Sequence, residues 1–246
     1  MHTRRIAVVA GGSGGIGEGI VFALLNQGYR VYVPTRDGDH SARLREFVGA
    51  DADVHLVPAD LADADQVERL RKEIVDAEGH IDTVVVSVGS YYYGHRMHRM
   101  PVEDWNRTLR DNLSTHFNIQ RAFVGQLREQ NRGTYVVLSG PEADTIHPDE
   151  QVMSIMAAAQ KMMARVIAHE AFDSMVRVYS ITAQTSIATR SRDAQNNPDW
   201  IPARDLGSYV AALVAGHVPG IHETRHEIRD RRHLDAVLDE VRRRTG

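Results

Sequence analysis

The stretch Ile6–Gly17, with the sequence IAVVAGGSGGIG, decides the fold of this chain. Ile6–Ala10 is a short, continuous apolar run, which is typical of a parallel strand buried on both faces. Four of the next five residues are glycines, and a segment with helical spacing then runs to Gly28. Glycines let backbone N–H groups approach an anion at a helix N-terminus. The stretch therefore predicts a cradle for the pyrophosphate of a dinucleotide.

Length and composition indicate one α/β domain spanning residues 1–246. With 42% hydrophobic residues the chain can bury a sizeable core, and its formal charge of −4 gives no general attraction to nucleic acid. Cysteine is absent, and no His, Asp or Glu cluster has the spacing of a metal site. No apolar run has membrane-spanning length, and the first residues lead directly into a strand. We therefore expect a cytoplasmic protein with no metal, nucleic-acid or membrane partner.

Apolar strands alternate with helices along the rest of the chain. Further strands are predicted at 30–33, 54–60, 83–89, 134–139 and 176–181, and helices at 41–48, 63–77, 102–130, 151–172 and about 233–244. Strands that are apolar throughout need helices on both faces of their sheet. The fold expected is a Rossmann-like, doubly wound parallel sheet of about seven strands, with a ligand at the carboxyl ends of the strands.

Several motifs make the chain resemble the short-chain dehydrogenase/reductase family. Residues 10–17 match the family's T-G-x-x-x-G-x-G motif, with alanine in place of the threonine. Asp60-Leu61 matches the position whose carboxylate holds the adenine amino group, and Asn112 matches an asparagine that orders an active-site water. The resemblance implies that the cofactor-binding residues are Gly11, Ser13, Gly15, Ile16, Gly17, Thr35, Arg36, Asp60, Leu61 and Gly89.

The end of the second predicted strand indicates which cofactor to expect. An acidic residue there would accept hydrogen bonds from the ribose hydroxyls of NAD, whereas arginine favours the 2′-phosphate of NADP. By the resemblance the deciding position is Thr35, which is not acidic, and Arg36 follows it. The pair favours NADP(H), with NAD(H) as the alternative.

The catalytic residues of the family are missing. Its members place a serine after the fifth strand and a Tyr-x-x-x-Lys motif on the next helix, and the tyrosine exchanges a proton with the substrate. By the resemblance Gly140 occupies the serine position, while Met153 and Ala157 occupy the tyrosine and lysine positions. No tyrosine occurs between Tyr135 and Tyr179, so a shifted alignment does not restore the motif.

Replacement groups must come from the helix and loops around the same crevice. Asn112, Ser139 and Tyr93 are the candidate catalytic residues, and Tyr93 could donate a hydrogen bond to an oxyanion. The other loop candidates, with one histidine on the helix after Asn112, are Tyr91, Tyr92, His95, His98, His116, Glu142, Asp144 and His147. Histidine is the natural acid or base near neutral pH.

Three functions fit this sequence. The first is an atypical NADP(H)-dependent carbonyl or alcohol oxidoreductase on an apolar or aromatic small molecule, with the proton supplied by a loop residue, water or the substrate. The second is a non-redox catalyst, such as a dehydratase, cyclase or isomerase, on the same fold. The third is a catalytically silent subunit. The resemblance implies a homo-oligomer, or a hetero-oligomer with an active relative, formed through the predicted helices 102–130 and 151–172.

Overall fold

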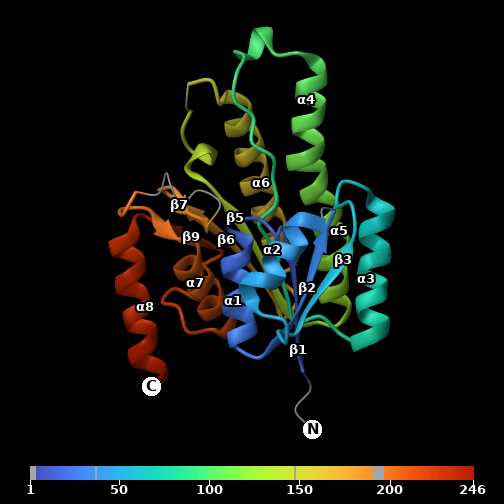
Figure 1. Cartoon of the computed structure of the whole chain (residues 1–246), viewed down its shortest axis with the longest axis vertical. Helices are drawn as coiled ribbons and strands as arrows, with labels where there is room; N and C mark the ends of the chain where they lie inside the picture. The colour runs from blue at the N-terminus through green and yellow to red at the C-terminus, as the bar shows by residue number, and fades with distance from the viewer. Residues whose placement is uncertain (1–3, 37, 147, 191–196) are drawn as a thin grey trace.

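Seven parallel strands form one sheet in the computed structural model, which describes residues 4–36, 38–146, 148–190 and 197–246 (Figure 1). The strands are β1 (Arg5–Ala10), β2 (Tyr29–Thr35), β3 (Val54–Pro58), β4 (Thr83–Val86), β5 (Gly133–Ser139), β6 (Val176–Ala183) and β9 (Arg225–Ile228). Their order is β3-β2-β1-β4-β5-β6-β9, with every neighbouring pair parallel. The predicted doubly wound sheet is confirmed, and its order reverses between β1 and β4.

Helices cover both faces of the sheet. One face carries α1 (Gly17–Asn26), α2 (Gly38–Val48), α7 (Ala203–Ala215) and α8 (Arg231–Thr245), and the other carries α3 (Ala64–Glu78), α5 (Thr115–Glu129) and α6 (Gln151–Glu170). Val9 of β1 belongs to the first core and its neighbour Val8 to the second. Because successive side chains of a strand point to opposite faces, a strand inside two cores must be apolar throughout.

The structure differs from the predicted elements in three places. The predicted helix at 102–130 consists of α4 (Val102–Leu109), a π-helical segment, η2 (Arg110–Ser114), and α5. The predicted strand at 83–89 ends at Val86, which leaves residues 87–89 as a loop. The elements not predicted from the sequence are α7, β9, the short strands β7 (Ile187–Ala188) and β8 (Ile201–Pro202), and the 3-10 turns η1 (Met97–Arg99) and η3 (Pro141–Ala143).

Helix α7 fixes the position of α1 through glycine. A Cβ on Gly19 of α1 would lie 2.1 Å from the backbone oxygen of Ala203, and a Cβ on Gly207 would lie 2.1 Å from the oxygen of Gly19. The two helix backbones therefore touch, and no side chain fits between them. This contact holds the N-terminus of α1, and the glycine turn before it, at the carboxyl end of β1.

No helix within the described ranges combines the length and the apolar character needed to cross a bilayer. In the same ranges, no three His, Asp or Glu side chains gather as a metal site would require.

We expect Gly207→Ala to destabilise the protein by about 3 kcal/mol, because the added methyl group must force two helix backbones apart. Gly125→Ala is the matched control, since Gly125 is also helical but has nothing within 4 Å of an added Cβ. The control should gain up to about 1 kcal/mol from helix propensity. Urea unfolding of both variants measures the difference, and equal stabilities would contradict the tight contact.

Candidate functional site

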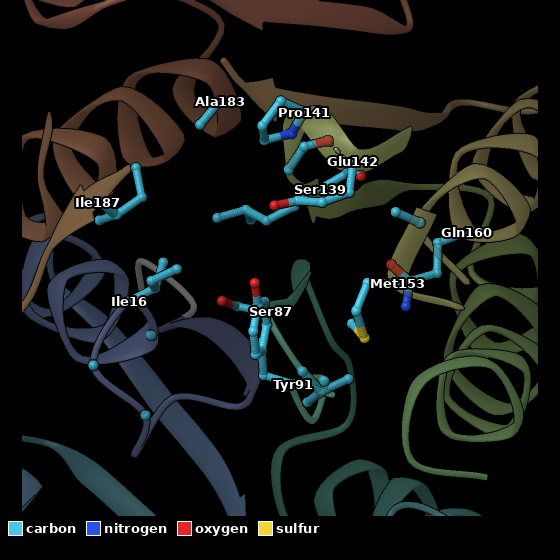
Figure 2. A pocket seen from close by; sticks show the side chains of 18 of the residues that line it. Ile16, Ser87, Tyr91, Ser139, Pro141, Glu142, Met153, Gln160, Ala183 and Ile187 are labelled. Carbon is cyan, nitrogen blue, oxygen red and sulfur yellow. Dashed lines mark hydrogen bonds between the residues drawn. The ribbon is translucent and has the colours of Figure 1, made fainter. Parts of the chain in front are cut away.

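A cavity of about 530 Å³ opens at the carboxyl ends of the strands, between the glycine turn and α6. Figure 2 shows Ile16 and Ile187 on one side of it, Met153 and Gln160 on the opposite side, and Ser139 between them. The cavity lies where the strand order reverses, which is the ligand position of doubly wound folds.

One face of α6 forms a wall of the cavity. Met153, Met156, Ala157 and Gln160 line it, and their spacing of three and four residues places them on one side of a helix. Gln160 is the one polar residue of this wall, and its buried Nε2 donates to the backbone oxygen of Asn112 at 3.0 Å. The positions that the resemblance assigns to tyrosine and lysine therefore face the cavity with methionine and alanine side chains.

Asn112 lies in the π-helical segment and faces the same cavity. Its Nδ2 donates to the backbone oxygen of Thr108 at 3.0 Å and to Oγ of Ser90 at 3.3 Å. A Cβ on Gly89 would lie 2.7 Å from Oδ1 of Asn112, so this side chain packs directly on the loop after β4. π-Helical bulges are frequent at functional sites, and this one gives Asn112 its place at the cavity.

A carboxylate occupies the space beside Gly140. Ser139 and Gly140 both line the cavity at the end of β5, where the sequence places Ser139 as a candidate catalytic residue. A Cβ on Gly140 would lie 2.0 Å from Oε2 of Glu142, which also lines the cavity. The sequence signal for this arrangement is a glycine two residues before an acid, which is too common to single out Glu142.

The three tyrosines of the loop after β4 differ in whether they line the cavity. Tyr93 is exposed and is not among the residues that line the cavity, whereas Tyr91 of the same triplet does line it. The hydroxyl of Tyr92 forms a hydrogen bond with Nδ1 of His95 at 3.0 Å and donates one to Oδ2 of Asp104 at 3.3 Å. The second bond connects this loop to α4. Tyr91 therefore lies at the cavity, with a side chain that is also mostly exposed, whereas the predicted candidate Tyr93 does not line the cavity.

The remaining acids and bases have structural partners or lie elsewhere. Asp144 forms an ion pair with Lys161 of α6. His116 is buried, and its Nε2 donates to the backbone oxygen of Val88 at 3.1 Å. His98 is exposed and does not line the cavity, and His147 lies outside the described residues.

A second cavity of about 360 Å³ adjoins the first along the loop after β4. Gly14, Ser87, Val88, Gly89 and Ser90 line both cavities. The predicted cofactor-binding residues that line only the second are Gly11, Ser13, Thr35, Arg36, Asp60 and Leu61, and those that line only the first are Gly15, Ile16 and Gly17. The structure therefore gathers the whole predicted set along one continuous cleft.

Two arginines flank the carboxylate of Asp60. Arg36 lies 3.5 Å from Oδ1, and Arg110 of the π-helical segment pairs with Oδ2. Oδ1 also accepts a hydrogen bond from the backbone N–H of Ala62 at 3.1 Å. The carboxylate is thus held at the wall of the second cavity, with the mostly exposed guanidinium of Arg36 beside it.

The glycine turn fits the phosphates of a dinucleotide. Gly11 has a φ of 81°, and a Cβ on it would lie 2.2 Å from the backbone oxygen of Ser87. A Cβ on Gly17 would lie 2.0 Å from the oxygen of Gly11. Ile16 caps α1 without a side-chain hydrogen bond. In the first turn, the N–H groups of Glu18 and Gly19 donate to the backbone oxygens of Gly14 at 2.9 Å and Ile16 at 3.2 Å, so an anion would meet the glycine turn that precedes them.

The fold and the cleft define the doubly wound α/β class, whose members bind ligands at the strand switch point. The chain belongs to the short-chain dehydrogenase/reductase family, because the family model described as enoyl-(acyl carrier protein) reductase matches residues 10–212.

Curated relatives come from the same family. A rhamnolipid biosynthesis 3-oxoacyl-[acyl-carrier-protein] reductase from Pseudomonas aeruginosa is 26% identical over 204 residues, which cover 81% of this chain and 79% of the relative. A 3-oxoacyl-[acyl-carrier-protein] reductase from Staphylococcus aureus is 30% identical over 141 residues, which cover 56% of this chain and 57% of the relative.

Solved structures share the fold. A metagenomic short-chain oxidoreductase in complex with NADP superposes with a TM-score of 0.77 at 23% identity, over 91% of this chain and 95% of the other. A short-chain dehydrogenase/reductase from Mycobacterium ulcerans has a TM-score of 0.82 at 20% identity, over 94% and 90% of the two chains.

Burial lowers the pKa of His116 to about 4, against an ordinary value of about 6.5. Between these values the unfolded chain binds a proton that the folded chain does not, so stability falls as the pH drops through this window. We expect a loss of about 3 kcal/mol from pH 7 to pH 4 that His116→Gln removes.

The check is urea unfolding across pH 4–7, with the exposed His98→Gln as the control. Wild type and the control should lose stability in parallel. If His116→Gln loses as much as they do, the assignment of this pH dependence to His116 is wrong.

Proposed function

We propose that this protein binds NADP(H) along the two adjoining cavities and acts as an atypical carbonyl or alcohol oxidoreductase. The observation that carries the proposal is the shared wall, from Gly14 and residues 87–90, which joins the glycine turn to both cavities. A dinucleotide has two ends joined by a pyrophosphate, and a cleft with a phosphate cradle between two cavities matches that shape.

NADP(H) is favoured over NAD(H) by the second cavity. Thr35 and Arg36 follow each other at the end of β2, and His40 of α2 lines the same cavity. A guanidinium beside the ribose attracts the 2′-phosphate, while no carboxylate at position 35 competes for the ribose hydroxyls. Solved structures with this fold include complexes with NADP, among them those of the metagenomic oxidoreductase and ElxO.

The bound cofactor would supply hydride transfer, and the first cavity would hold the substrate. Met153, Met156 and Ala157 give that cavity an apolar wall, which suits an apolar or aromatic small molecule. No lysine or histidine occurs among the described residues that line it. The proton therefore comes from a loop residue, water or the substrate. The candidates predicted from the sequence that lie at the cavity are Asn112, Ser139, Tyr91 and Glu142.

The apolar wall formed by Met153, Met156 and Ala157 also supports a second candidate function, a cofactor-bound protein without redox turnover. Neither Met153 nor Ala157 can carry a proton or a charge. Such a protein would be a silent subunit, or would use the cavity for dehydration, cyclisation or isomerisation.

A fluorescence titration tests cofactor binding. NADPH should bind more tightly than NADH. Arg36→Ala should weaken the binding of NADPH about tenfold and change the binding of NADH less than about twofold, because only NADPH carries the 2′-phosphate. Arg132→Ala, a basic residue that does not line either cavity, is the control. Absence of NADPH binding at millimolar concentration would contradict the proposal.

Single-turnover oxidation of bound NADPH then separates the two candidates. A panel of quinones and aromatic ketones should oxidise NADPH faster in the presence of the protein than in its absence. Binding without any oxidation across the panel would favour the non-redox candidate.

We also propose that a second copy of the chain covers the exposed apolar face of α5 and α6. Phe117, Ile155, Met162 and Val166 on these helices are all 43–52% exposed. Large apolar side chains gathered on neighbouring helices are typical of an interface between subunits.

Val166→Glu should shift the protein toward monomer, because the interface would bury an unpaired charge. Light scattering after size-exclusion chromatography measures the mass. Met175→Glu, at an exposed apolar residue between α6 and β6 and outside both predicted interface helices, is the control and should keep the wild-type mass. A wild-type protein that is already monomeric would contradict the proposal.

A further inference from the structure

The first cavity contains one charged side chain among the described residues that line it, the carboxylate of Glu142. Tyr91 is the only other ionisable side chain among the lining residues that the structure describes, and these residues include no arginine, lysine or histidine. A ligand in this cavity therefore meets the negative charge of Glu142, which no cation among the described lining residues balances.

The Glu142 carboxylate reaches this position because residue 140 is glycine. Its Oε2 lies 2.0 Å from the place where a Cβ of residue 140 would stand. Any side chain at Gly140 would displace the carboxylate. The two residues therefore act as a pair, in which the glycine provides the space that the carboxylate fills.

The loop that carries Glu142 is tied to α6. Lys161 forms an ion pair with Asp144, and Oγ of Ser154 donates to the backbone oxygen of Thr145 at 2.9 Å. Oγ1 of Thr145 in turn donates to the oxygen of Pro141 at 2.9 Å. The ammonium of Lys161, the lysine nearest in the chain, is thus engaged by Asp144, and within the described ranges Glu142 forms no ion pair.

We propose that Glu142 binds a cationic group that enters the cavity beside Gly140. A carboxylate in a partly enclosed cavity without a counter-ion attracts a cation and repels an anion of the same shape. The cation has two possible sources, a protonated amine on a small aromatic ligand or the nicotinamide ring of the oxidised cofactor. The second source rests on the proposed function, and the first does not.

The test of the amine source uses three naphthalene probes of one size. Saturation-transfer NMR titrations of the full chain compare 2-naphthylmethylammonium, 2-naphthalenemethanol and 2-naphthoate. The cation should bind at least about tenfold more tightly than the anion, with the alcohol between them. Glu142→Gln should reduce this preference to less than about twofold.

Two further variants locate the effect. Gly140→Ser should also remove the preference, because its Cβ displaces the carboxylate while the charge of the chain stays the same. Glu150→Gln is the control, since it removes an equal charge from the same loop but does not line the cavity, and it should keep the wild-type preference.

The test of the cofactor source compares dissociation constants of NADP⁺ and NADPH. If Glu142 faces the nicotinamide ring of the oxidised cofactor, Glu142→Gln should weaken the binding of NADP⁺ several-fold and leave the binding of NADPH unchanged. An effect of Glu142→Gln in either test supports the proposal and identifies which of the two cations Glu142 binds.

The proposal is overturned if both tests fail. In that case wild type shows no preference for the ammonium over naphthoate, or Glu142→Gln leaves this preference unchanged, and Glu142→Gln also leaves the ratio of the NADP⁺ and NADPH dissociation constants unchanged. Failure of NADPH to bind at all would instead overturn the proposed function, and the naphthalene probes would still decide the role of Glu142.

Discussion

Backbone contact around α1 is the constraint on which the rest of the structure depends. Gly17 packs on the oxygen of Gly11, and Gly19 packs on the oxygen of Ala203 in α7. These contacts place the N-terminus of α1 at the carboxyl end of β1, beside the loop that follows β4. Both cavities adjoin that point, so the part of the cleft where they meet depends on glycine positions at which no side chain fits.

The central sheet could be predicted because burial on both faces leaves a direct sequence signal. Ile6–Ala10 and Thr83–Val86 are apolar almost without interruption, and all of these residues are buried. β9 has no such signal, because Arg225–Ile228 is an edge strand with an exposed arginine and a half-buried glutamate. Polar residues on an edge strand discourage its pairing with another chain, and they also remove the apolar run by which a strand is recognised in the sequence.

α7 escaped prediction for the opposite reason. Nine of its thirteen residues are buried, from Ala203 to Val214, so it lacks the polar face that gives a surface helix its period. The π-helical segment was equally hidden. Residues 102–130 have the pattern of one long helix, and the bulge at Asn112 depends on contacts with Ser90 and Gln160 from distant parts of the chain.

Some residues of the candidate site could likewise be predicted from local sequence, whereas others depend on long-range contacts. Asn112 follows from a motif position and Ser139 from being next to one, and both line the first cavity. The choice between Tyr91 and Tyr93 does not, because it depends on how Tyr92 anchors its loop to Asp104 of α4. The place of Glu142 depends on Gly140 in sequence, but also on the ion pair between Asp144 and Lys161.

These contacts explain how nucleotide binding and proton transfer can change independently on this fold. The phosphate cradle consists of backbone groups and absent side chains, so it survives as long as the glycines remain. Proton transfer needs a group that can exchange a proton, and the side chains of Met153 and Ala157 on α6 cannot do so. The lysine that α6 does carry, Lys161, instead holds the loop of Glu142. Helix α6 thus positions a loop in this protein, while the segments after β4 and β5 contribute Ser87, Ser90 and Glu142 to the cavity.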